Sequence, residues 1–303
     1  MFGDFKNAFQ RYNNSHVQLI YLNVAVFLGL GILFVIAKFS SFPPLFTEVY
    51  KQFTLPSELM DLAKRPWTLI TYGFAHHYSF NPAKIDILHI LFNMLGLYWF
   101  GKVFIEYLGS DKLVAVYILG VLAGGILYLL LYNTIPIFME SRATLVGASA
   151  AVFAVMTAVA VLIPDYTFYL LLLGPVKVKY IAAFYIVMSL LFSAIENAGG
   201  NFAHLGGAFI GFVYIRQLQA GSNWGSWITA TIDWFKNLFK EKRKVKVTYR
   251  NQPPYEDVRR NAGVKGSSIS QAEIDAILDK INAGGYESLS KDEKEKLFNA
   301  SKK

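Results

Sequence analysis

The chain has 303 residues, of which 54% are hydrophobic and 17% are charged, and its mean hydropathy is +0.36. Soluble globular proteins carry roughly 25% charged residues, so this composition excludes an ordinary soluble domain and indicates a protein that crosses a membrane several times. The net charge is +8, and cysteine is absent, which excludes disulfides, thiolate metal sites and cysteine nucleophiles.

Six apolar stretches approach the roughly 20 residues that a helix needs to cross the hydrocarbon layer. The first follows Lys6 and Arg11. It is longer than the roughly 7–15 apolar residues of a signal peptide and shows no small-residue cleavage site, so we expect a retained helix. The expected fold is all-α, a polytopic membrane protein with a bundle of six transmembrane helices. The stretches lie near residues 17–37, 85–107, 113–135, 145–163, 180–196 and 201–219.

If the chain crosses the membrane six times, several segments that carry lysine and arginine lie on the same side. Short connections carry Lys112, Lys177 and Lys179, and a basic run follows at 236–246. The positive-inside rule makes this side cytoplasmic. We therefore expect a multi-pass protein of the cell membrane, in a bacterial inner membrane, with both termini in the cytoplasm.

Composition divides the chain into four segments. Residues 1–16 are a polar cytoplasmic lead, and 17–219 form the membrane domain. Residues 220–247 have apolar side chains at helical spacing beside the basic run, which predicts an interfacial helix with anionic lipid bound at 236–246. A loose solvated helix is the alternative for that segment. Residues 248–303 form the fourth segment.

This last segment begins as a polar linker with Pro253-Pro254. Two capping boxes follow, Ser270 with Glu273 and Ser290 with Glu293. They predict a small cytoplasmic helical hairpin.

Within the membrane domain, the connection 38–84 is far longer than the roughly 2–8 residues usual between bundle helices, which is typical of a functional or membrane-surface loop.

Three polar side chains lie near the beginnings of alternate spans. His89 belongs to the second span, Ser149 to the fourth and His204 to the sixth. Alternate spans cross in the same direction, and an offset of four residues is roughly 6 Å of depth. We therefore expect the three groups in one layer below the outer surface, reachable by water from that side. Polar and ionisable groups in hydrocarbon are costly and usually functional.

Small residues allow the fourth and sixth spans to approach closely. Gly207 and Gly211 form a Gly-x-x-x-Gly pair, and the fourth span is rich in glycine and alanine from Gly147 onward. Such contact would bring the Ser149 hydroxyl to a His204 nitrogen for general-base activation. Phe153 follows Ser149 by one turn and could stack on the imidazole. No acidic residue occupies a third position, so we expect a dyad whose imidazole is oriented by packing.

His89 and Asn93 are four residues apart and share one helical face. With the backbone N–H of Ser149, they could form an oxyanion hole. Interhelical hydrogen bonding is an equally good interpretation of this pair. Taken singly, a buried serine or histidine such as Ser149 or His204 is more often a packing residue than a catalytic one. Their common depth favours a catalytic role for the pair.

These motifs together resemble the rhomboid family of intramembrane serine proteases. The resemblance rests on His89-x-x-x-Asn93, Gly147-x-Ser149 and Ala203-His204-x-x-Gly207-x-x-x-Gly211, with Trp67 and Phe74-x-His76 before them. It implies a rhomboid-like bundle, a catalytic Ser149–His204 dyad, and an oxyanion site from His89, Asn93 and the Ser149 amide. It further implies a serine endopeptidase that cleaves the transmembrane segments of membrane proteins near their outer ends, without cofactor, metal or nucleic acid. The chain departs from the family in carrying Ala150 where glycine is common, and in a longer spacer between His76 and His89.

A catalytically inactive rhomboid-like protein that binds or routes membrane clients is the main alternative. Such proteins keep the fold while losing the serine or histidine, and both are present here. A transporter would need midplane charges and broken helices in repeated halves, which the sequence does not show. The sequence also lacks the motifs of zinc and aspartyl intramembrane proteases.

Overall fold

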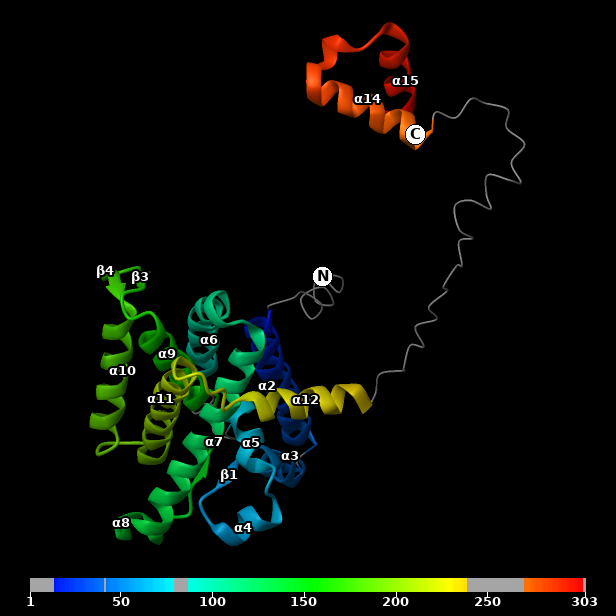
Figure 1. Ribbon diagram of the computed structural model, residues 1–303. Coiled ribbons are helices and arrows are strands. Elements are labelled where there is room, and N and C mark those ends of the chain that lie inside the picture. The colour runs from blue at the N-terminus through cyan, green and yellow to red at the C-terminus, as the bar shows by residue number, and fades with distance from the viewer. Residues whose placement is uncertain (1–13, 41, 79–86, 239–269, 302–303) are drawn as a thin grey trace. The chain divides into compact units, whose positions relative to one another are not determined.

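The computed structural model describes residues 14–40, 42–78, 87–238 and 270–301 (Figure 1). The chain forms two units, Met1–Lys240 and Glu241–Lys303. The predicted lead 1–16 and linker 248–269 lie wholly or mostly outside the described residues. A helical bundle makes up the first unit: α2 (Ser15–Phe39), α6 (Ile87–Leu108), α7 (Ser110–Thr134), α9 (Ser149–Leu162), α10 (Val178–Phe192) and α11 (Ala198–Gln219).

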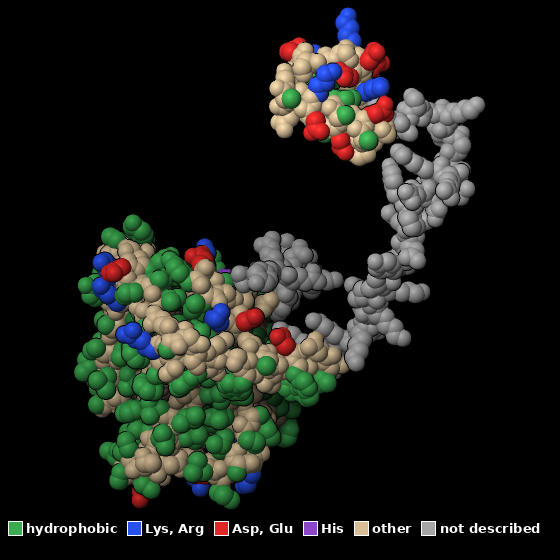
Figure 2. Space-filling view, viewed as in Figure 1, with side chains coloured by type: hydrophobic (Ala, Val, Ile, Leu, Met, Phe, Trp, Pro, Cys, Tyr) green, Lys and Arg blue, Asp and Glu red, His purple; other side chains and the backbone are tan. Residues whose placement is uncertain are grey.

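The six bundle helices coincide with the six predicted stretches to within a few residues at each end. In the described part of the chain, α2, α6 and α7 are long and apolar enough to cross a membrane, while α9 and α10 are shorter apolar helices. Figure 2 shows hydrophobic side chains over most of the visible face of this unit, with most charged side chains towards its two ends. A helical bundle whose long helices could cross a membrane is therefore confirmed for the described residues. Six crossings remain a prediction.

The centre of the bundle is α9, whose residues Ala150 to Val159 are all buried. Glycines of α7 make room for it: a Cβ built on Gly120 would lie 2.6 Å from Cβ of Ala154, and one built on Gly124 would lie 2.5 Å from Cβ of Ala150. The methyl group of Ala150, the residue that departs from the family pattern, thus occupies space left by the missing side chain of Gly124.

The long connection after α2 is folded rather than extended. It contains α3 (Pro43–Tyr50), η1 (Lys51–Phe53), β1 (Leu55–Pro56), α4 (Leu59–Lys64), α5 (Thr68–Thr71) and η2 (Tyr72–Phe74). Two tyrosines tie it to α7: Tyr72 donates to the carbonyl of Val121 at 2.6 Å, and Tyr117 donates to the carbonyl of Gly73 at 2.8 Å. This connection therefore forms part of the bundle's packing.

Two small antiparallel sheets make the all-α prediction wrong in detail. Strand β1 pairs with β2 (Thr144–Leu145), with Leu55 opposite Leu145. Strands β3 (Thr167–Leu170) and β4 (Gly174–Lys177) form a hairpin between α9 and α10, where a plain loop was expected. At its base, Lys177 and Lys179 each lie 2.9 Å from Asp165. Hydrogen bonds from Lys179, the larger effect, and from Lys177 lower the pKa of Asp165 to about 2. The short helix α8 (Pro136–Met139) lies between α7 and β2.

The predicted interfacial helix is α12 (Ser226–Leu238). Part of its apolar face packs on the bundle, because Ile228 is buried and Ile232 packs against the same core. Trp227, Trp234 and Phe235 are exposed. The basic run 236–246 lies almost entirely outside the described residues, so lipid binding there stays a prediction.

The second unit is the predicted helical hairpin: α14 (Gln271–Gly284), η4 (Tyr286–Ser288) and α15 (Lys291–Ser301). Both capping boxes form. Glu273 accepts from the Ser270 backbone N–H at 3.0 Å, and Glu293 accepts from that of Ser290 at 2.7 Å. Ile277 and Leu289 are its buried apolar residues.

Candidate active site

Ser149 is the first residue of α9, at the end of a non-helical segment. The segment turns at Gly147, whose φ of +135° is one that residues with a side chain rarely adopt. Its N–H donates to the carbonyl of Tyr72 at 3.0 Å. The helix therefore begins four residues after the start of the predicted stretch 145–163, because it cannot begin before the turn at Gly147.

The Ser149 hydroxyl and the His204 imidazole meet as the motifs predicted. Oγ of Ser149 lies 2.8 Å from Nε2 of His204, which is within α11. The two helices touch through small residues: a Cβ on Gly207 would collide with the carbonyl oxygen of Ala150, and one on Gly211 with that of Ala154. Both glycines therefore lie at the contact between α9 and α11.

Phe153 stacks on the imidazole of His204, with ring centroids 4.4 Å apart and an interplanar angle of 12°. Tyr185 of α10 contacts the other side of Phe153 edge-on, with centroids 6.2 Å apart. The predicted stacking is thus present, and it fixes the plane of the imidazole ring.

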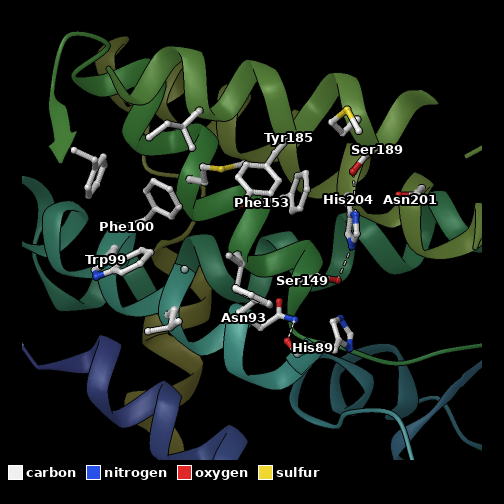
Figure 3. A pocket seen from close by; sticks show the side chains of 18 of the residues that line it. His89, Asn93, Trp99, Phe100, Ser149, Phe153, Tyr185, Ser189, Asn201 and His204 are labelled. Atoms are coloured by element: carbon white, nitrogen blue, oxygen red, sulfur yellow. Dashed lines mark hydrogen bonds between the residues drawn. The ribbon is translucent and has the colours of Figure 1, made fainter. Parts of the chain in front are cut away.

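Packing is not the sole orienting contact. Oγ of Ser189, on α10, lies 3.1 Å from Nδ1 of His204 (Figure 3). Sequence reasoning missed Ser189, because it looked only for an acidic third residue. The available signal was weak: a single serine in the apolar run Tyr185–Phe192.

His89 and Asn93 of α6 face the same cavity as Ser149. Nδ2 of Asn93 donates to the carbonyl of His89 at 2.8 Å, and Asn93 is buried. The His89 ring lies close to Gly147, where a built Cβ would be 3.0 Å from its Cε1. His76, 5.8 Å from His89 between ring centroids and edge-on, is fully buried and bonds Asn23 at 3.3 Å. The structure therefore places both predicted oxyanion residues in the cavity that Ser149 also lines.

The cavity that contains these groups has a volume of about 350 Å³ and is lined mainly by apolar side chains. Its polar groups gather at one end, around Ser149 and His204 (Figure 3). Apolar walls come from α6, α9 and α10, and from the hairpin through Phe168 and Leu170. Among the described residues, no cluster of three or more His, Asp or Glu side chains could hold a metal ion.

The arrangement can transfer a proton from a serine hydroxyl to an imidazole beside hydrogen-bond donors for an oxyanion. These groups lie at one end of the mainly apolar cavity.

Comparison with known proteins shows which families the chain resembles. The family model for the Rhomboid domain matches residues 63–219, and that of a family of unknown function (DUF6576) matches residues 268–303. The chain is 34% identical over 166 residues to the RHOMBOID-like protein 12, mitochondrial, of Arabidopsis thaliana. That match covers 51% of this chain and 47% of the plant protein, so the chain spans about half the length of this relative.

Proposed function

Since the chain belongs to the rhomboid family, we propose that it is an intramembrane serine endopeptidase that cleaves transmembrane segments of membrane proteins. The observation that carries the proposal is the 2.8 Å contact between Oγ of Ser149 and Nε2 of His204. A nucleophile and a base within hydrogen-bond reach are the requirement for activating a serine hydroxyl.

In the proposed reaction, Oγ of Ser149 attacks the carbonyl carbon of the scissile peptide bond and passes its proton to Nε2 of His204. The negative charge moves to the carbonyl oxygen, where the backbone N–H of Ser149 and the side chains of Asn93 and His89 stabilise it. Collapse of this intermediate breaks the C–N bond, and the imidazolium gives its proton to the leaving amine. Water, deprotonated by the same imidazole, then hydrolyses the ester and regenerates Ser149.

The substrate class follows from the walls of the cavity. Its volume of about 350 Å³ is at the small end of the roughly 300–1,000 Å³ usual for ligand sites. It therefore suits the apolar side chains of a short unwound segment rather than a whole helix. Membrane-protein substrates are thus the proposed partners.

We also propose that the termini and the β3–β4 hairpin are cytoplasmic, and that the connection after α2 faces outward. Lys112, Lys177 and Lys179 support this orientation. Because the chain has no cysteine, single cysteines at exposed positions can test it. An impermeant maleimide added to intact cells should label Met60→Cys but not Leu172→Cys, and the reverse pattern would contradict the proposed orientation.

The experiment that tests the activity uses purified protein in vesicles with a model transmembrane substrate. Ser149→Ala and His204→Ala should each abolish cleavage, because neither member works alone. A protein that only binds membrane clients predicts no cleavage by the native protein and unchanged substrate binding in Ser149→Ala.

A further inference from the structure

The imidazole of His204 has a hydrogen-bond partner on each of its two nitrogens. Nε2 contacts Ser149 at 2.8 Å, and Nδ1 contacts the hydroxyl of Ser189 at 3.1 Å. Ser189 comes from a third helix, α10, and only 5% of its surface is exposed. A hydroxyl buried beside the second nitrogen of the expected base can accept a hydrogen bond from that nitrogen when it carries the proton.

A neutral imidazole carries one proton, and only one of the two tautomers is productive. If the proton is on Nδ1, then Nε2 has the lone pair that accepts the Ser149 proton. If the proton is on Nε2, the imidazole cannot act as the base towards Ser149. The Nδ1–H tautomer requires an acceptor beside Nδ1, and the Ser189 oxygen is in that position.

We propose that Ser189 is a positioning residue whose hydroxyl oxygen accepts the Nδ1–H of His204 and so completes a hydrogen-bonded Ser149–His204–Ser189 chain. This inference rests on the proposed protease function. In this role Ser189 transfers no proton and acts only through Nδ1 of His204. It acts by holding the imidazole in the tautomer and rotation that direct the Nε2 lone pair at Ser149.

Stacking alone does not provide this selection. Phe153 lies almost parallel to the imidazole, with an interplanar angle of 12°. A half-turn of the ring about its Cβ–Cγ bond preserves that plane but exchanges Nδ1 with Cδ2 and Nε2 with Cε1. The contact with Ser189 favours the observed orientation, because Nδ1 can hydrogen-bond to the hydroxyl and Cδ2 cannot.

The helix that carries Ser189 also meets the substrate cavity. Tyr185 and Met188 of α10 line the same cavity as Ser149. The orientation of the base is therefore set by an element that a bound substrate segment would touch directly.

Kinetics of three variants in vesicles test the proposal. Ser189→Ala should lower kcat about 10-fold, which corresponds to the loss of one hydrogen bond, and leave KM within about 2-fold. Ser189→Thr keeps a hydroxyl and should recover most of kcat. The matched control is Ser193→Ala, one turn further along, whose hydroxyl donates to the carbonyl of Leu190 instead. It should behave as the native protein. Native kcat in Ser189→Ala would overturn the proposal.

A spectroscopic measurement on the native protein decides the point even if a variant fails to fold. With ¹⁵N-labelled histidine, the His204 signals, assigned by their loss in His204→Gln, should show the Nδ1–H tautomer. An Nε2–H tautomer would overturn the role of Ser189. Absence of proteolysis by the native protein would instead overturn the proposed function, and the ¹⁵N result would still decide the tautomer.

Discussion

The position of the Ser149 hydroxyl depends on the residue two places before it. Gly147 turns the chain with a φ of +135° and is tied to Tyr72 through its backbone N–H. The side that would carry its Cβ faces the His89 ring. One glycine thus satisfies a backbone requirement and a steric one, and it places the serine at the start of α9 beside the expected oxyanion donors.

At the same scale, Asn93→Ala should reduce kcat about 10²–10³-fold, because removing one oxyanion donor typically costs that much. The inserted fold should survive, since the Asn93 side chain bonds only the carbonyl of His89 one turn earlier among the contacts observed. Steady-state cleavage in vesicles measures the effect. A change below about 3-fold would assign Asn93 to bundle packing instead.

The residues of the site were predictable to different degrees. Ser149, His204 and Phe153 follow from spacing, because small residues and one-turn offsets determine which side chains can meet. Ser189 was not predictable, since a single serine in an apolar helix is usually a packing residue and its meaning depends on which helix faces His204. His76 was noticed only as a family motif, and its burial beside Asn23 and His89 requires the tertiary structure.

Among the elements, the contact between α9 and α11 controls the geometry of the dyad. It has no tolerance for a side chain at Gly207, because the Ala150 carbonyl occupies the Cβ position. Backbone atoms cannot rotate away as a flexible side chain can. The approach of these two helices is therefore set by backbone contact.

Gly207→Ala should accordingly abolish most activity while the protein still inserts in the membrane. Overpacking usually costs about 1–3 kcal/mol, and displacement of the dyad reduces catalysis further. The matched control is Gly29→Ala on α2, where a built Cβ meets nothing within 4 Å. Cleavage and thermal unfolding should be native-like in the control. Equal activity in the two variants would contradict the account.

The hairpin of the second unit should lose stability in acid. Hydrogen bonds from the Ser290 backbone N–H, the larger effect, and from Lys280 lower the pKa of Glu293 from its usual 4.5 to about 2. A carboxyl group whose pKa is lower in the folded state stabilises the fold above its unfolded pKa. That contribution is lost as the pH falls from about 4.5 to about 2.

Hydrogen exchange of the α15 amides in the whole protein checks this expectation. Protection should fall across that pH window in the native chain and should fall less in Glu293→Gln. The same decline in both proteins would show that another group is responsible.

Element boundaries and small strands were the least predictable features. The apolar stretches located all six bundle helices because hydrophobicity is a continuous signal over about 20 residues. The β3–β4 hairpin depends on local pairing, on the turn at Gly174 with a φ of +69°, and on two lysines that converge on Asp165. None of these contacts has a periodic pattern in the sequence.

At the scale of the whole molecule, the chain combines a membrane unit with a separate small unit. All residues of the candidate site belong to the first unit, Met1–Lys240. The second unit matches a family of unknown function.

Truncation after Arg250 should therefore leave cleavage of a model transmembrane substrate within about 2-fold of the full chain. The reason is that the dyad, the oxyanion residues and the cavity remain intact. Equal amounts of inserted protein, measured by quantitative blotting, are the necessary control. An inserted but inactive truncated protein would assign the second unit a part in catalysis.

The central claim is that His204 activates Ser149 as a nucleophile. Its most direct test is to treat the detergent-solubilised native protein with a fluorophosphonate and locate the adduct by mass spectrometry. The account predicts one adduct, on Ser149, which disappears in His204→Ala. No adduct on Ser149, or undiminished labelling of Ser149 without His204, would contradict it.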